Sequence, residues 1–147
     1  MSESCSVYLI VSDAPPPAWS DINLRANMSM CKIGVSRSVR GRLTTLQTAS
    51  PYRLCIWDEW ELRSRSQAEK LEKSLHEACS CYHATGEWFF ADPSFLKYIV
   101  DDVLCVEAVE SWEMTPHDVV EYFTSRGYQN DHARDIVTAN FTLETAA

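Results

Sequence analysis

Three short runs of apolar residues in the first 62 positions constrain the fold more than any other feature of the sequence. Residues 7–11 (VYLIV) are continuously apolar, and residues 31–36 (CKIGVS) and 53–62 (RLCIWDEWEL) follow. Short runs rich in β-branched and aromatic residues favour strands over helices. The pattern therefore predicts three strands, with a long loop over residues 12–30 that contains Pro15, Pro16 and Pro17.

Apolar residues at helical spacing predict a short helix directly after the second run. Val39, Leu43 and Leu46 fall on one face, with Arg42 on its flank. A serine, at position 36 or 38, is placed to cap the first turn, because a serine hydroxyl accepts hydrogen bonds from free amide groups there.

A second helix is indicated by the capping-box spacing of Ser66 and Glu69. Its apolar face consists of Ala68, Leu71, Leu75, Ala78 and Cys79. Asp92 followed by Pro93 predicts the start of a third helix that ends at about Leu104.

The C-terminal region predicts a helical hairpin. Thr115 and Pro116 form another cap-and-proline signature, Gly127 marks a helix end, and Asp131 is placed to cap a last helix through Ala139. We therefore expect one main domain over residues 1–104 and an acidic helical extension over residues 105–147.

Composition supports a folded chain. Among 147 residues, 46% are hydrophobic and only 4 are glycine, which argues against disorder and low-complexity filaments. No apolar run reaches the roughly 18 residues of a membrane span, and the start MSESCSV does not resemble a signal peptide. We expect a cytoplasmic or nuclear protein that does not bind membranes.

The six cysteines are dispersed, mostly within apolar runs, so we interpret them as small core residues rather than a disulfide framework. A zinc site made by His76, Cys79, Cys81 and His83 is an alternative. Its C-x-C spacing differs from the usual zinc knuckle.

The net charge of −8 is distributed unevenly. Residues 1–100 contain 11 basic and 11 acidic residues, whereas residues 101–147 contain 2 basic and 10 acidic ones. Residues 31–73 carry a local charge of +4, from 9 basic and 5 acidic residues. This segment is either an anion-binding surface or an ordinary solvated face. The acidic region is predicted to compete with phosphate for the basic face or to recruit a basic protein partner.

The order of several short motifs resembles the GIY-YIG endonuclease superfamily. The first half-motif is matched by Ser6-Val7-Tyr8, and the second by Lys32-Ile33-Gly34. Arg42 follows in the next helix, Glu72 in the later one, and residues 86–89 read GEWF. The similarity covers residues 7–90 and is strongest to the phage and fungal branch that carries KIG in place of YIG. It implies an α/β fold with a small three-stranded antiparallel sheet flanked by helices.

The resemblance implies metal-dependent cleavage of phosphodiester bonds. Glu72 would hold Mg²⁺ or Mn²⁺, and Arg42 would bind the scissile phosphate. Tyr8 would position or deprotonate the attacking water. Since a phenol has a pKa near 10, it needs a nearby cation, for which Lys32 is the candidate. His76 would orient water or assist Glu72.

We expect nucleic acid as the partner, DNA more than RNA, with Arg37, Arg40 and Arg42 contacting its phosphates. Tyr8, Arg42 and Glu72 are then predicted to converge on one solvent-accessible cleft. Two alternatives remain at this point. Arg42 and Glu72 could form only an interhelix salt bridge, or the fold could bind nucleic acid or protein without cutting.

Overall fold

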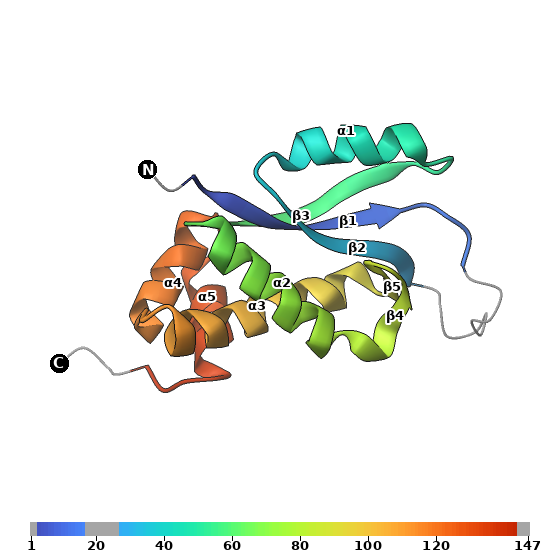
Figure 1. Cartoon of the computed structure of the whole chain (residues 1–147). Helices are drawn as coiled ribbons and strands as arrows, with labels where there is room; N and C mark the ends of the chain where they lie inside the picture. The colour runs from blue at the N-terminus through green and yellow to red at the C-terminus, as the bar shows by residue number, and fades with distance from the viewer. Residues whose placement is uncertain (1–2, 17–26, 144–147) are drawn as a thin grey trace. The chain divides into compact units, whose positions relative to one another are not determined.

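The computed structural model describes residues 3–16 and 27–143, so part of the predicted 12–30 loop lies outside the described residues. The chain divides into two compact units, Met1–Lys97 and Tyr98–Ala147, and each is described by itself. The strands are β1 (Cys5–Ser12), β2 (Ser29–Ser36), β3 (Leu54–Leu62), β4 (His83–Thr85) and β5 (Trp88–Ala91). The helices are α1 (Val39–Ala49), α2 (Arg65–Ala78), α3 (Pro93–Ser111), α4 (Pro116–Ser125) and α5 (Asn130–Thr138), with a 3₁₀ turn, η2, at Ser80–Tyr82 (Figure 1).

The first unit contains a five-stranded antiparallel sheet in the order β3-β1-β2-β5-β4. The expected three-stranded sheet is therefore wrong, although the α/β class holds. The three predicted strands are β1, β2 and β3. The additional β4 and β5 have only 3 and 4 residues, which is too short for an alternating pattern to be recognised. They form a hairpin whose second strand pairs with β2.

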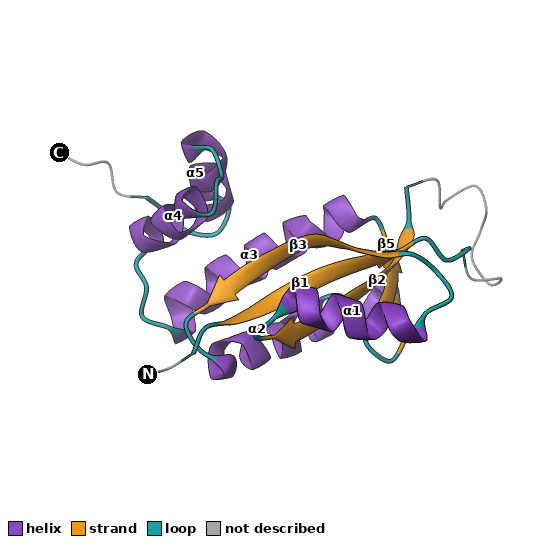
Figure 2. Ribbon diagram, turned by 90° about the horizontal axis from the view of Figure 1, so that it is seen from above, coloured by secondary structure: helices purple, strands orange, loops and turns teal. Residues whose placement is uncertain are grey.

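Helices cover both faces of the sheet in this unit. Tyr8 and Ile10 point to one face, where they pack with Val39 of α1 and Leu54. The α2 helix packs on β1 and β2, and its buried residues include Leu71 and Leu75. Figures 1 and 2 show α1 and α2 on opposite sides of the strands. The core therefore lies in two layers, above and below β1 and β2.

Of the two predicted serine caps in this unit, one is confirmed and the other is wrong. Ser38 caps α1, because its side chain accepts a hydrogen bond from the amide of Gly41. The capping residue of α2 is Ser64, whose hydroxyl accepts from the amide of Gln67 at 3.2 Å, so the predicted capping box at Ser66 is not formed. The helix begins before Ser66 because Ser64 already satisfies the first turn.

The second unit consists of the remainder of α3 and the two C-terminal helices. The third helix is expected to end at about Leu104, but α3 continues to Ser111, so the expected domain boundary at 104/105 lies within a helix. Thr115 and Asp118 form a capping box at the start of α4. The cap of α5 is Gln129, and the predicted cap, Asp131, lies in the first turn. The helices α4 and α5 pack against each other.

In the described part of the chain, no helix combines the length and the apolarity that a bilayer crossing requires. The six cysteines are free thiols, of which Cys5, Cys31, Cys79 and Cys105 are buried. The other two, Cys55 and Cys81, are exposed, so the expectation of core cysteines fails for them.

Candidate active site

Tyr8 and Gly34 belong to the two half-motifs and lie directly opposite each other on β1 and β2. The Tyr8 side chain is only 1% exposed. A Cβ atom added to Gly34 would lie 2.3 Å from the Tyr8 hydroxyl oxygen and 2.5 Å from Cζ. Because no side chain fits at that distance, position 34 is glycine to let the Tyr8 ring lie against the strand.

The edge of β2 that faces away from β1 is paired with another strand along only part of its length. Residues 29–32, which we call the paired end, pair with β5. The Ile33 amide then donates to the Glu87 carbonyl oxygen at 3.3 Å. In the described residues no strand pairs with this edge at positions 34–36, which we call the open end. The Tyr8–Gly34 contact lies at this open end.

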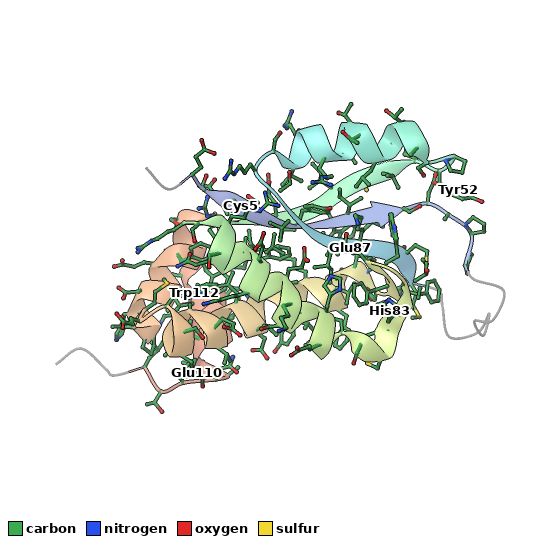
Figure 3. All side chains as sticks on the ribbon, in the orientation of Figure 1. Cys5, Tyr52, His83, Glu87, Glu110 and Trp112 are labelled. Carbon is green, nitrogen blue, oxygen red and sulfur yellow. The ribbon has the colours of Figure 1, made fainter. Side chains whose placement is uncertain are left out.

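Lys32 lies at the last position of the paired end and is 8% exposed. Its ammonium group forms an ion pair with the Glu87 carboxylate. Figure 3 labels Glu87, which belongs to the turn between β4 and β5. A buried ammonium group is costly without a counter-charge, so Glu87 is what allows Lys32 to occupy the sheet.

Burial raises the pKa of the Tyr8 phenol to about 12, and the charges of Glu87 and Glu72 act in the same direction. The guanidinium of Arg42 opposes them and lowers the pKa. The cation that acts on Tyr8 is therefore Arg42, whereas the sequence suggested Lys32. Tyr8 is a neutral phenol throughout the physiological pH range.

Glu72 is half-buried on α2, and burial is the main reason why the pKa of its carboxyl group is raised. The Glu87 charge adds to this effect, while His76 and Lys32 lower the pKa of Glu72. Two carboxylates thus act on each other in a partly dehydrated place, a situation that a divalent cation relieves.

His76 lies one helical turn after Glu72 and is held from two sides. Its Nε2 donates to the Ile33 carbonyl oxygen at 3.0 Å, and its ring meets Phe89 edge-on at 5.0 Å between centroids. Because a carbonyl oxygen can only accept, Nε2 carries a proton. His76 thus connects α2 to the strand that bears Lys32 and Gly34.

The predicted phosphate-binding arginines differ in their surroundings. Arg40 and Arg42 are exposed on α1, whereas Arg37 forms an exposed ion pair with Glu3 at 2.8 Å. Among the described residues no ion pair joins Arg42 to Glu72, so the interhelix salt bridge is not what brings them near Tyr8. Arg42 keeps its guanidinium available.

Charge effects and one ion pair link side chains from four elements and one turn near the point where the paired end of β2 meets its open end. We call Tyr8, Lys32, Arg42, Glu72, His76 and Glu87 the β2 cluster. Within this cluster the Tyr8 phenol is buried and the Arg42 guanidinium is exposed. Sequence reasoning missed Glu87. The available signal was its place in the GEWF motif, where a charge stands between a turn glycine and an apolar strand.

The alternative zinc site is not formed. His76 and His83 each direct Nε2 to a main-chain carbonyl oxygen, those of Ile33 and Gly86. In the residues that the structure describes, no three His, Cys, Asp or Glu side chains gather as a metal-binding group. The carboxylate of Glu72 nevertheless fits a hard divalent ion that keeps most of its waters, since such an ion needs few protein ligands.

Comparison with known proteins identifies the family of this chain. A family model of the T5orf172 domain matches residues 7–106, a span of 100 of the 147 residues that contains the whole β2 cluster. No curated protein and no solved structure matches the chain. The chain belongs to the T5orf172 domain family.

Proposed function

We propose that this protein is a metal-dependent endonuclease that hydrolyses phosphodiester bonds in nucleic acid, with DNA favoured over RNA. Membership of the T5orf172 domain family is consistent with a nuclease or nucleic-acid-binding role. The observation that supports the proposal is that the charges of Arg42, from α1, and Glu72, from α2, both act on the Tyr8 phenol of β1.

Each side chain has a task in such a reaction. The exposed Arg42 guanidinium donates paired hydrogen bonds to the phosphate and offsets the charge that grows in the transition state. The Glu72 carboxylate would hold Mg²⁺ or Mn²⁺, which supplies Lewis-acid stabilisation of the phosphate and leaving-group oxygens. Lys32 adds a second positive charge close by.

Tyr8 acts from below the surface. With a pKa of about 12, its phenol is protonated in the free protein, so it cannot remove a proton from water before substrate binds. It can orient a water molecule through its hydroxyl group. A base role requires more positive charge near the hydroxyl group than Arg42 alone provides.

The experiment is a cleavage assay on supercoiled plasmid and on single-stranded DNA and RNA, with Mg²⁺, Mn²⁺ or chelator. We expect metal-dependent products that are lost in Glu72→Gln. The matched control is Glu69→Gln on the same helix, which removes the exposed Glu69–Arg65 ion pair and leaves the β2 cluster intact. Wild-type levels of cleavage in Glu72→Gln would contradict the proposal.

Binding without cutting is the second candidate, and the burial of Tyr8 is the observation that favours it. A phenol that is 1% exposed and protonated is a poor starting point for catalysis. In that case Arg42→Ala weakens binding of nucleic acid in a gel-shift assay, while no metal ion produces cleavage by the wild-type protein.

For the second unit we propose a role outside phosphate binding. Acidic side chains are exposed on its helices, among them Glu121 of α4 and Asp131 and Asp135 of α5. Such a surface repels nucleic acid and attracts a basic protein partner.

A further inference from the structure

Glu87 is fastened to β2 at two points. Its carbonyl oxygen accepts from the Ile33 amide at 3.3 Å, and its carboxylate forms the ion pair with Lys32. The two contacts involve neighbouring residues of the second half-motif. A main-chain contact and a side-chain contact from the same residue fix the direction of that side chain.

The turn that carries Glu87 is itself held in place. Gly86 has a φ of +56°, a conformation that favours glycine, and its carbonyl oxygen accepts a hydrogen bond from His83 Nε2 at 2.8 Å. His83 also meets Phe89 edge-on at 5.7 Å between ring centroids. Figure 3 labels His83, at the start of β4, and Glu87, within the turn. These contacts of His83 hold the turn, and with it Glu87, in a fixed position.

The Lys32–Glu87 ion pair differs from the surface pairs of this protein. Its two side chains are 10% and 48% exposed, whereas Arg65 and Glu69 are 56% and 58% exposed. Glu87 is hydrated well enough to stand alone, but the Lys32 ammonium is not. The ion pair therefore stabilises mainly the Lys32 ammonium, because only this buried charge needs a counter-charge.

Resting on the proposed function, we propose that Glu87 is a positioning residue of the active site, which holds the Lys32 ammonium at the last residue of the paired end of β2 for a substrate phosphate oxygen. Lys32 is the residue that touches substrate, and Glu87 acts through it. The second half-motif, through Lys32, and the GEWF motif, through Glu87, then contribute to one site although they lie far apart in the sequence.

The first test observes the lysine directly and needs no catalysis. An ammonium group held in an ion pair exchanges its protons slowly, so a ¹H–¹⁵N ammonium correlation of Lys32 is expected at low temperature. Glu87→Gln should abolish this signal, Glu87→Asp should retain it weakly, and Glu69→Gln should leave it unchanged. Asp58→Asn distinguishes the signal of Lys97, which pairs with Asp58.

The second test measures coupling in the cleavage assay. Glu87→Gln is expected to lower kcat about tenfold, as the loss of groups that orient active-site residues commonly does, with partial rescue in Glu87→Asp. In the Lys32→Met background the same change should have no further effect. Thermal unfolding of each variant shows that the fold is intact.

Three outcomes separate the hypotheses. A Lys32 ammonium signal that persists in Glu87→Gln overturns the positioning role. So does an equal loss of kcat from Glu87→Gln in the wild-type and Lys32→Met backgrounds. If the wild-type protein does not cleave at all, the proposed function fails, while the ammonium signal still decides whether Glu87 positions Lys32.

Discussion

The two ends of strand β2 differ in how many neighbouring strands they pair with. The paired end, residues 29–32, pairs with β5, and from residue 30 onward it also pairs with β1 on the other side. The open end, residues 34–36, has β1 on one side and no described strand on the other. Both ends contribute to the same sheet, and the β2 cluster lies where they meet: Lys32 is the last residue of the paired end, and Gly34, opposite Tyr8, is the first of the open end.

The difference teaches where a small sheet can accommodate charges. Close to the point where β5 stops, the charges of Arg42 and Glu72 act on the same Tyr8 phenol, although their helices, α1 and α2, lie on opposite sides of the sheet (Figure 1). The end of a strand pairing thus creates a place for polar groups, as loops do at the ends of strands.

The largest expected effect comes from removing the Glu72 carboxylate of the β2 cluster. Glu72→Ala should lower cleavage by a factor of about 100 or more, because a metal ligand of the proposed reaction is lost. Glu69→Ala, one turn earlier and exposed, is the control and should retain activity. Rates are compared on one plasmid substrate under single-turnover conditions. Equal activity of the two variants would contradict the proposed role of Glu72 as the metal ligand of the β2 cluster.

The second prediction concerns stability at alkaline pH. Tyr8 has a pKa of about 12 in the folded protein and near 10 when unfolded. Its contribution is therefore fully present below pH 10 and lost as the pH rises from 10 to 12. The full loss, reached at about pH 12, amounts to about 3 kcal/mol, since each pKa unit corresponds to 1.36 kcal/mol. Urea unfolding at pH 8, 10 and 11 measures roughly the first half of this loss, and Tyr8→Phe should show a smaller decline.

Gly34→Ala tests the steric contact at the open end. The added methyl group would collide with the Tyr8 ring, and we expect a loss of about 2 kcal/mol in the free energy of unfolding. Gly41→Ala is the matched control in α1, where the nearest atom to the new Cβ is Ser38 Oγ at 3.1 Å. That change should be nearly neutral or slightly stabilising. A neutral result for Gly34→Ala would mean that Tyr8 moves aside freely.

The smallest effect is expected from the two coupled carboxylates. The pKa of Glu72 is raised, so its ionisation disfavours the folded state, and the protein loses stability as the pH rises through that pKa. Glu72→Gln should therefore stabilise the protein slightly at pH 7 and not at pH 3. Glu87→Gln should lower the pKa of Glu72, which carbon NMR of its carboxyl group can follow. An unchanged pKa would show that the two charges do not interact.

Sequence patterns predict the long elements of this protein and fail for the short ones. The runs around Tyr8, Ile33 and Trp60 are sufficient to place β1, β2 and β3. The β4–β5 hairpin is missed because its strands are held by pairing with β2 and not by a periodicity of their own. The α3 helix continues past its expected end since no breaking residue follows Leu104 before residue 111.

The sequence predicts those candidate site residues that belong to a recognisable motif. It does not predict a residue whose role depends on a contact that only the fold creates. Tyr8, Arg42 and Glu72 follow from the motif order. Which cation acts on Tyr8 depends on side-chain placement, and the lowering effect of Arg42 on the pKa of Tyr8 does not follow from the motif order. Glu87 becomes visible only once β5 lies beside β2, a long-range pairing that spacing along the chain does not reveal.

The close fit of Tyr8 over Gly34 has a consequence for the evolution of such sequences. Position 8 carries a ring only as long as position 34 carries no side chain, so neither residue is free to change alone. Among descendants of this chain, a larger residue at 34 should appear together with a smaller one at 8. These two positions, 26 residues apart, are inherited as one unit.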